Sequence, residues 1–500
     1  MSQKKNSLPQ EANQKYAQLN TRRMFLQQCG LGVASMAIGS VLGGCGDNQL
    51  ANSGNPIVRQ VQQITNNLPH FAPKAKSVIF LHMAGAPSQL ELFDYKPALA
   101  KLHGQKCPES LIAGKKFAFI RGIPTMLGPQ APFQQRGRSG AWVSDLLPHL
   151  AEVADEISFL KAIHTDQFNH APAQLLMHTG GARLGRPSMG SWVTYGLGSE
   201  NENLPGFMVL TSGGYNPDAG KQVWGSGFLP SVYQGVQCRT KGDPVLYLSD
   251  PKGMNRDIRR ASIDAINQVN KLTHQEFQDP ETVARIAQYE MAFRMQIAVP
   301  EVMNIKDEPA YIHELYGTEI GKASFANNAL LARKLVEKGV RFVQLFDWGW
   351  DTHGVSSDTA LDIGLVDKCK ATDRPVAALI KDLKQRGLLE ETLVVWAGEF
   401  GRTPMQENRN GVGQSFLGRD HHTDAFTIWM AGGGIKRGYT HGATDELGYN
   451  AVSGAQSIFD VQATILHQLG FDHERFTYQF QGRPFRLTDV EGEVIKEIVS

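Results

Sequence analysis

The alternation of helix-type segments with short apolar runs is the feature that most limits how this chain can fold. After residue 310, segments with apolar residues three and four positions apart alternate with runs typical of buried strands. The predicted order there is helix 324–339, strand 340–346, helix 375–391, strand 392–398, strand 425–433 and helix 460–470. Earlier in the chain we predict strands at 77–83 and 204–214 and a helix at 279–296. This alternation is typical of a mostly parallel sheet with helices on both faces, so we predict a three-layer α/β domain.

In a sheet of this kind, functional groups collect beyond the carboxyl ends of the strands. His82 ends the first strand, "DWGWDTHG" follows the strand at 340–346, and Glu399 follows "TLVVWAG". A D-x-H pair such as Asp351 and His353 can direct a carboxylate and an imidazole at one ion. Such ligands suit zinc, manganese or iron better than calcium. The loop is therefore predicted to bind a divalent metal ion, and an ordinary polar loop is the alternative.

Further residues of ligand type accompany this loop. In "GRDHH", His421 and His422 precede a strand, and adjacent side chains of an extended chain point to opposite sides. We therefore expect only one of these two histidines to face the metal site. Asp347 is either an extra ligand or a polar group that fixes the turn. Glu399 is a ligand, a general base or the ion-pair partner of Arg402.

Two other positions have a possible role in catalysis. His170 is predicted to begin a helix, where backbone N–H groups and the helix dipole favour an anion, although a histidine there is usually only a cap. Ser88 in "GAPSQ" is either a nucleophile or, as is commoner in such a turn, a helix cap. Trp348 and Trp350 are expected to form walls of the site.

The N-terminus carries a separate signal. Arg22 and Arg23 precede a weakly apolar, glycine-rich stretch at about 29–44, which resembles a twin-arginine export signal. The stretch is short for a permanent membrane span. It ends in "LGGC", so Cys45 resembles the lipid-modified cysteine of a bacterial lipoprotein. Residues 46–75 are polar and are predicted to be a linker.

These segments predict the organisation of the whole chain: a signal peptide at 1–45, a linker at 46–75 and one domain at 76–500. The 50 Lys and Arg residues balance 49 Asp and Glu, which argues against a protein that binds nucleic acid or a membrane surface. We expect membrane contact only through the N-terminal anchor, and the twin-arginine translocase as a partner during export. Beyond a lipidated Cys45, the mature chain would keep three widely spaced cysteines, which argues against a disulfide framework: Cys107, Cys238 and Cys369.

Several motifs together resemble one bacterial family. They are "WDTHG", "GEFGRTP", "GRDHH", "RLGRPSMGSWVTYGLGSENENLPGF" and "FDVQATILHQLG". In combination they resemble the family of domain of unknown function 1501 over about residues 75–495. That family looks like a sulfatase-like branch of the alkaline phosphatase superfamily. The resemblance implies an alkaline-phosphatase/sulfatase-like sandwich, and it says more about the fold than about the reaction.

The wider superfamily allows a comparison residue by residue. Sulfatases carry a C-x-P-S-R segment where this chain has "HAPAQLLMHTG". His170 takes the place of the cysteine nucleophile and Gln174 that of the arginine, so sulfatase maturation chemistry is excluded. A histidine there would be a nucleophile, a ligand or a general base. The superfamily's D-H-G corresponds to residues 399–401, which keep a carboxylate and lose the histidine, and His82 stands near the position of a lost aspartate.

The resemblance implies one retained metal site, formed by Asp351, His353 and either His421 or His422. A second site has lost its usual ligands, but His82, His170 and Glu399 are ligand-type residues near its expected position. The leading hypothesis is an exported, metal-dependent hydrolase that acts on a phosphate or sulfate ester, either a small molecule or a polysaccharide. His170 and Glu399 would hold or deprotonate the nucleophile, and Arg402 would clamp the oxyanion. The protein would be periplasmic or a lipoprotein facing the periplasm. The alternative is a catalytically silent, membrane-tethered binding or assembly protein on the same scaffold.

Overall fold

The computed structural model describes residues 69–214, 216–239, 245, 250, 253–277, 280–411 and 414–500. The predicted twin-arginine segment with Arg22 and Arg23, the predicted lipidation site Cys45, and the linker as far as residue 68 lie outside the described residues. The chain divides into two compact units, Met1–Asn55 with Gln479–Pro484, and Pro56–Tyr478 with Phe485–Ser500. Of the first unit the structure describes only 479–484. The second unit contains the sheet and the site.

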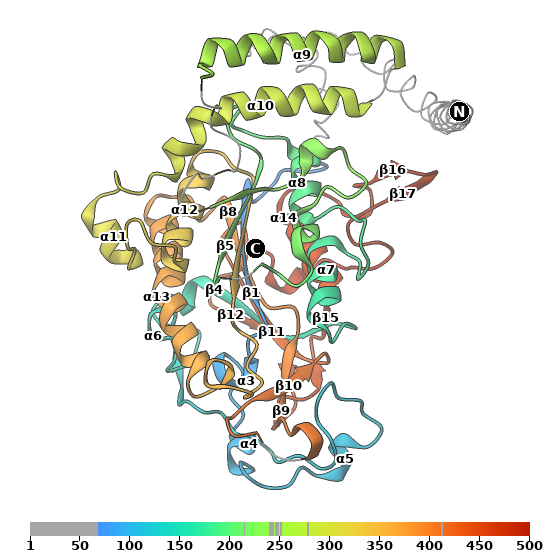
Figure 1. Cartoon of the computed structure of the whole chain (residues 1–500). Helices are drawn as coiled ribbons and strands as arrows, with labels where there is room; N and C mark the ends of the chain where they lie inside the picture. The colour runs from blue at the N-terminus through green and yellow to red at the C-terminus, as the bar shows by residue number, and fades with distance from the viewer. Residues whose placement is uncertain are drawn as a thin grey trace, which may run out of the picture. The chain divides into compact units, whose positions relative to one another are not determined.

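A nine-stranded sheet lies at the centre of the second unit (Figure 1). Its order is β12-β4-β11-β8-β1-β7-β5-β6, with β15 also paired to β4. The strands are β1 (Ser77–Ala84), β4 (Ile157–His164), β5 (Phe207–Ser212), β6 (Val236–Cys238), β7 (Phe342–Trp348), β8 (Thr392–Ala397), β11 (Phe426–Ala431), β12 (Tyr439–His441) and β15 (Gln456–Ser457). All pairs are parallel except those that β11 forms with β4 and β8.

Helices cover both faces of this sheet (Figure 1). One face carries α6 (Pro148–Ala151), α11 (Ala310–Tyr316), α12 (Phe325–Glu337) and α13 (Gly364–Gln385). The other carries α7 (His170–Thr179), α8 (Met189–Leu197) and α14 (Ile458–Gln468). Strand β1 is mostly apolar because its alternate side chains enter two cores, Val78 and Phe80 on the α7 side and Ile79 and Leu81 on the α12 side. The predicted three-layer α/β architecture with a mostly parallel sheet is confirmed.

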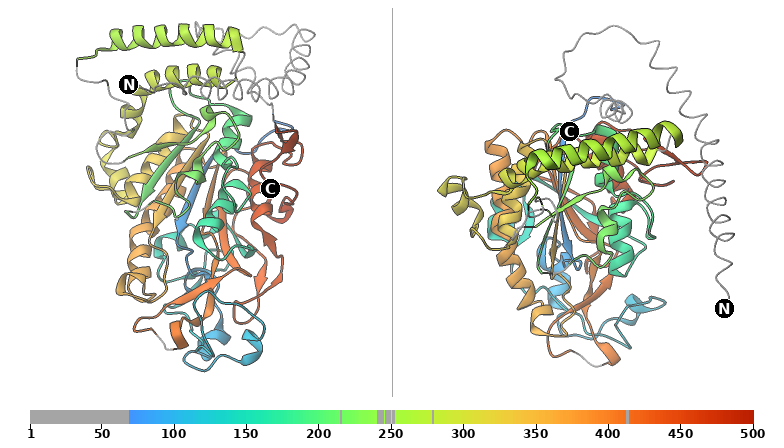
Figure 2. Two further views of the ribbon diagram at one scale, coloured as in Figure 1. Left: turned by 45° about the vertical axis from the view of Figure 1, so that its right-hand side comes forward. Right: turned by 45° about the horizontal axis from the view of Figure 1, so that its top comes forward.

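The predicted elements differ from the observed ones in their limits. The helix predicted from Pro375 begins at Gly364, so this proline lies inside α13 rather than at its start. The apolar run at β4 was not among the predicted strands, although it pairs with three others. The helix predicted at 279–296 is α10 (Pro280–Met303), and it lies beside α9 (Arg256–Phe277), as both views in Figure 2 show. Arg260 and Glu290 join these two helices by an ion pair.

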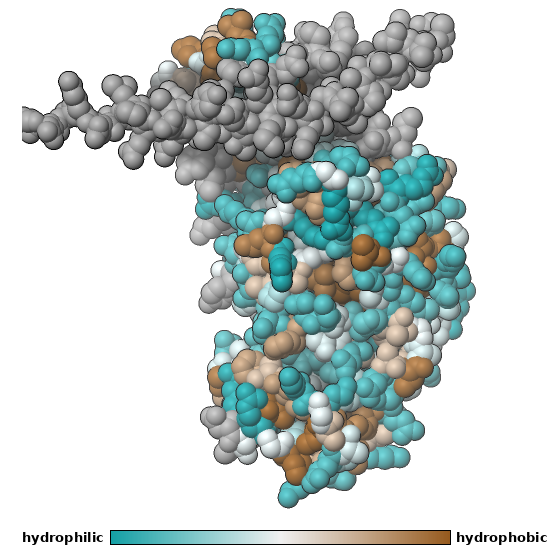
Figure 3. Space-filling view, turned by 90° about the vertical axis from the view of Figure 1, so that its right-hand side faces the viewer, coloured by the Kyte–Doolittle hydropathy of each residue, from teal (hydrophilic) through white to brown (hydrophobic). Residues whose placement is uncertain are grey.

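The described residues also form smaller elements, some of which include residues of the first unit. They are α3 (Gln89–Leu92), α4 (Pro97–Lys101), α5 (Glu109–Ile112), β2 (Phe133–Arg136), β3 (Ala141–Ser144), β9 (Gly401–Gln406), β10 (Arg419–His422), β13 (Ala443–Thr444), β14 (Ala451–Ser453), β16 (Tyr478–Phe480) and β17 (Arg483–Phe485). Within the described ranges, no helix has the length and apolar character that a membrane crossing requires. On the face drawn in Figure 3, apolar residues lie in small groups among polar ones.

The reversed direction of β11 brings the site together. Since β1, β7 and β8 run parallel, their carboxyl ends share one edge of the sheet. Strand β11 runs the opposite way beside β8, so its first residue, Phe426, lies at this same edge. Strand β10 comes shortly before β11 in the chain and pairs with β9, which follows Glu399 at the end of β8. The segments "WDTHG", "GEFG" and "RDHH" therefore meet at one place.

Candidate metal centre

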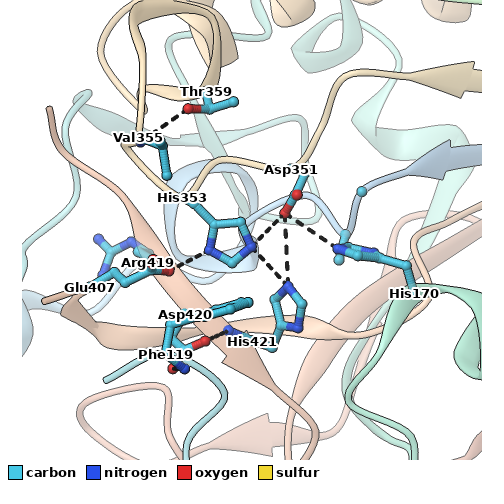
Figure 4. A network of polar contacts seen from close by, with 12 residues as sticks. Phe119, His170, Asp351, His353, Val355, Thr359, Glu407, Arg419, Asp420 and His421 are labelled. Carbon is cyan, nitrogen blue, oxygen red and sulfur yellow. Dashed lines mark hydrogen bonds and ion pairs between the residues drawn. The ribbon is translucent and has the colours of Figure 1, made fainter. Parts of the chain in front are cut away.

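Four side chains from three segments converge at this edge of the sheet. Asp351 and His353 lie in the loop after β7, His170 is the first residue of α7, and His421 lies on β10 (Figure 4). Each of the four offers one ligand atom, and these atoms lie within 4.8 Å of one another. The structure thus groups the predicted Asp351 and His353 with one histidine of the "HH" pair and with the histidine in the sulfatase nucleophile position.

The distances within this group fit a single small cation. Asp351 Oδ1 lies 2.9 Å from His353 Nε2, 3.4 Å from His170 Nε2 and 3.8 Å from His421 Nε2. The Nε2 atoms of His353 and His421 are 3.0 Å apart. Tetrahedral ligands at zinc-like bond lengths would be separated by about 3.4 Å, in the middle of these values.

The outer nitrogen of each histidine has an acceptor that fixes its tautomer. His170 Nδ1 donates to Glu399 Oε1 at 2.6 Å, and His353 Nδ1 donates to Glu407. His421 Nδ1 donates to the carbonyl oxygen of Phe168 at 2.6 Å. With their protons on Nδ1, all three rings present Nε2 to the centre. Carboxylates and carbonyls in these outer positions are the usual partners of histidines that bind metals.

Electrostatics at the centre call for a cation. Burial disfavours the charged form of His421 and lowers the pKa of that imidazole to about 3, so His421 is neutral and its Nε2 carries a lone pair. This lone pair faces His353 Nε2 and the Asp351 carboxylate, which are also acceptors. His170 Nε2 is buried and forms no hydrogen bond within the part of the chain that the structure describes. Such a set of converging acceptors is stable only with a proton or a metal ion among them.

His170 supplies a positive charge when no metal is bound. Burial alone would lower its pKa, but its contacts with the carboxylates of Asp351 and Glu399 outweigh burial and raise the pKa to about 9. Burial would likewise raise the pKa of Asp351, yet the guanidinium of Arg402 and the three histidines hold it far below its usual range. A bound metal ion would replace the extra proton of His170, because only the neutral imidazole is a ligand.

The site is buried on the protein side and reaches solvent on the other. The Asp351 side chain is 30 % exposed and that of His170 15 %, whereas Glu399 behind them is fully buried. Phe119 packs edge-on against the rings of both His353 and His421. The centre is therefore most accessible to solvent on the side of Asp351 and His170.

Arg402 has a different role from the predicted oxyanion clamp. Its guanidinium is fully buried and donates to the carbonyl oxygens of Gly85, Ala86 and Arg419 and to Asp351 Oδ1. The remaining N–H points at His353 Nε2, 3.4 Å away. With its donors directed at these acceptors, Arg402 fixes Asp351 in the loop and cannot also hold a substrate oxygen. Of the three alternatives for Glu399, the ion pair with Arg402 is not formed, since Arg402 pairs with Asp351 and Glu399 pairs with His170.

Three residues predicted as possible ligands lie outside the four-residue group. His422 Nε2 contacts the carbonyl oxygen of Tyr449, so only His421 of the adjacent pair faces the centre. Asp347 accepts from Ser212 and Trp350 and pairs with Lys368, so it fixes the turn. His82 lies behind Glu399, with its Nε2 atom 3.4 Å from Glu399 Oε2.

Of the remaining predicted positions, Ser88 and Trp350 are buried and Trp348 is half-buried. Ser88 precedes α3, but its hydroxyl forms no cap hydrogen bond and has no partner among the described residues. Trp350 packs edge-on against Trp396, and its indole N–H donates to Asp347. Trp348 is the last residue of β7.

Some residues of the site carry no sequence signal. Glu407 completes the outer contacts of His353, and Arg409 donates to that same carboxylate. The guanidinium of Arg409 lies 4.0 Å over the ring of Phe119. Glu407 and Asp420 could form a second acidic group with His353. Asp420 instead accepts from the backbone N–H groups of Phe119, Ile120 and His421, which identifies it as a structural residue.

Gly418 lets two chain segments approach closely beside the site. A Cβ at Gly418 would lie 1.9 Å from the carbonyl carbon of His353 and 2.3 Å from the backbone nitrogen of Gly354. We expect Gly418→Ala to destabilise the fold by about 1–3 kcal/mol and to weaken metal binding, because backbone must shift. Gly225→Ala is the matched control, since its nearest neighbour would be 3.5 Å away. Urea unfolding and metal content of both variants test this, and equal stability of the two would contradict the close approach.

Comparisons with known proteins agree with the motifs noted above. The model of a family described as "Protein of unknown function (DUF1501)" matches residues 75–499, which confirms the family resemblance. Curated protein sequences give no match. Similar solved structures include the PsFucS1 sulfatase from Pseudoalteromonas sp., with 12 % identity, a TM-score of 0.34, and coverage of 84 % of this chain and 71 % of that one.

Two further structures show the same level of likeness. The alkaline phosphatase from the Antarctic bacterium TAB5 has 10 % identity and a TM-score of 0.29, over 72 % of this chain and 92 % of that one. The phosphonate monoester hydrolase SpPMH from Silicibacter pomeroyi has 12 % identity and a TM-score of 0.30, over 65 % of this chain and 68 % of that one. Identities and TM-scores this low say nothing about substrate or mechanism.

Proposed function

Since this chain belongs to the family described as protein of unknown function (DUF1501), whose members have no defined reaction to carry over, we propose its function from the site: a metal-dependent hydrolase of phosphate or sulfate esters. One observation carries the proposal. Three Nε2 atoms and one carboxylate converge at 2.9–3.8 Å, each histidine with its other nitrogen held by an acceptor. A donor set of this kind suits zinc, manganese or iron.

A bound divalent metal would supply the Lewis acidity that polarises an ester oxygen and acidifies water. The residues of the chain hold that arrangement in place. Glu399 orients His170, Glu407 orients His353, and Arg402 fixes Asp351. The exposed side of Asp351 and His170 is where a substrate oxygen would enter.

The anionic group of the substrate needs a cation other than Arg402. Arg409 is the candidate that the structure offers, because it is 38 % exposed and stacks on Phe119, whose ring touches His353 and His421. One of its nitrogens is held by Glu407, which directs the rest of the guanidinium. A planar guanidinium in that position would pair with two oxygens of a phosphate or sulfate group.

Export in the folded state is part of the same proposal. The four ligands come from positions 170, 351, 353 and 421, so the metal site exists only after the chain has folded. A twin-arginine signal with Arg22 and Arg23 would carry the folded, metal-loaded protein across the inner membrane, and lipidation of Cys45 would then tether it facing the periplasm. The substrate would be a small-molecule or polysaccharide ester.

Metal analysis combined with turnover tests this function. We expect the purified full chain to contain about one transition-metal ion per molecule and to hydrolyse an aryl phosphate or aryl sulfate, with turnover lost on chelation and restored by zinc, manganese or iron. A protein that binds no metal ion would contradict the site itself. Metal binding without turnover of either ester would support the alternative, a catalytically silent binding or assembly protein on this scaffold.

A further inference from the structure

A line of buried polar side chains extends from the metal centre into the hydrophobic core. Beyond Glu399 it comprises His82 on β1, His178 on α7 and Gln344 on β7, each at most 1 % exposed. Phe80 packs against both imidazoles, and Phe346 lies 5.1 Å from the ring of His82 and 5.2 Å from that of His178. Burying two imidazoles among phenylalanines costs free energy that leucines would not, so these rings need an explanation beyond packing.

Helix α7 links this line to the metal centre. His170, Gln174 and His178 are spaced four residues apart and therefore share one face of the helix. His170 Nδ1 and Gln174 Nε2 both bond Glu399 Oε1, at 2.6 Å and 3.1 Å. His178 reaches the other oxygen of Glu399 indirectly, through His82.

One carbonyl group sets the direction of the hydrogen bonds along this line. Val223 offers a carbonyl oxygen, which only accepts, so the amide nitrogen of Gln344 must face it, at 3.2 Å. The same nitrogen lies 3.1 Å from His178 Nδ1, which must then be an acceptor. Burial, reinforced by the neighbouring His82, holds the pKa of His178 well below its usual range, so the ring is neutral and its one proton is on Nε2.

The same reasoning continues to the metal centre. His178 Nε2 donates to His82 Nδ1 at 3.1 Å, so the proton of a neutral His82 is on Nε2. This nitrogen lies 3.4 Å from Glu399 Oε2, an ion-pair contact outside hydrogen-bond geometry. Glu399 also accepts from the backbone N–H groups of Gly85 and Ala86. These donors, together with the N–H of His82 that faces Oε2, favour Glu399 as an anion that receives the Nδ1 proton of His170.

We propose that His178 and His82 are positioning residues for the metal centre: they fix the direction in which the N–H groups point along the line of polar side chains from Gln344 to Glu399, the residue that holds His170. This direction keeps Glu399 an acceptor on both oxygens. His170 then has its proton on Nδ1 and presents Nε2 to the metal. This inference rests on the proposed metal site. It adds two further layers of residues behind Glu399, namely His82 and His178. It assigns His82 a task other than that of a ligand.

Zinc affinity of the metal-stripped full chain tests the inference. We expect His178→Leu to weaken zinc binding by about 10-fold, as loss of an outer-shell partner does. His178→Gln should bind zinc nearly as well as the wild type, since glutamine can accept from Gln344 and donate to His82. His473→Leu is the control, because His473 is also buried and hydrogen-bonded, to Thr488, but lies outside the line.

The outcomes separate this inference from the proposed function. A wild-type protein that binds no zinc overturns both. If the wild type binds zinc and His178→Leu binds it equally well, only the positioning role is overturned. Equal weakening by His178→Leu and His178→Gln also overturns it, because packing rather than hydrogen-bond direction would then matter.

A measurement on the wild type covers the case in which His178→Leu does not fold. Imidazole ¹⁵N shifts of the zinc-loaded protein report which nitrogen of each ring carries the proton. We expect the proton on Nε2 in His178 and His82 and on Nδ1 in His170. A proton on Nδ1 of His178 would reverse the direction of donation between Gln344 and His178 and overturn the proposal.

Discussion

Asp351→Asn is expected to weaken metal binding by at least about 100-fold and to reduce ester turnover correspondingly. The reason is that Asp351 is the only anion among the four ligands, and even outer-shell partners of a metal site cost 10–100-fold when they are lost. Asparagine keeps the shape of the side chain and an acceptor for Arg402. The fold should therefore survive with a loss of about 1–3 kcal/mol, less than for a fully buried ion pair because Asp351 is partly exposed. Metal content, thermal unfolding and turnover should be measured on one preparation.

Asp367→Asn serves as the control for this substitution. Asp367 is exposed and lies at the start of α13, where it pairs only weakly with Lys370. The control variant should match the wild type in metal content and turnover. An Asp351→Asn protein that stays folded and keeps its metal would show that the four residues do not form the site. If it keeps its metal and loses turnover, Asp351 acts in the reaction rather than in binding.

The fold was largely predictable because its signals are local. The strands at β1, β7 and β8 are continuous apolar runs, and the helices at α12 and α14 have regular apolar spacing. Strand β4 was not predicted because Lys161 interrupts its apolar run. This lysine is buried beside Asp94. The start of α13 was predicted too late in the chain because a proline usually marks the beginning of a helix. Here Pro375 lies within the helix.

The metal ligands were predictable to the extent that their chemistry is visible in short motifs. Asp351 and His353 lie two residues apart after a strand. Adjacent side chains of an extended segment point to opposite sides, so only one histidine of the "HH" pair was expected to be a ligand. Which of His421 and His422 faces the centre depends on how β10 pairs with β9, and no local pattern encodes that register. The roles of Glu407 as the partner of His353 and of Arg402 as a donor to backbone carbonyls depend in the same way on contacts between distant segments.

A second buried ion pair lies at the start of β10, the strand that directs His421 toward Asp351 and His353. Arg419, the first residue of β10, donates through Nε and Nη2 to Glu91 Oε1, at 3.0 Å and 2.6 Å. Its other N–H groups donate to the carbonyl oxygens of Leu127, Gly128 and Thr403. Arg419 and Glu91 are both fully buried, so neither charge has water to replace a lost partner.

Arg419→Met is therefore expected to lower the free energy of unfolding by about 3–5 kcal/mol, because the methionine fills the space and leaves the Glu91 carboxylate buried without a cation. Adding Glu91→Leu should recover part of this loss, since the second change removes the unpaired charge. Arg136→Met, at an ion pair with Asp145 that is about one-third exposed, should cost at most about 1 kcal/mol. Urea unfolding of the four proteins, wild type included, measures these differences. A cost for Arg419→Met no larger than that for Arg136→Met, or a double variant less stable than the single one, would mean that Glu91 does not depend on Arg419.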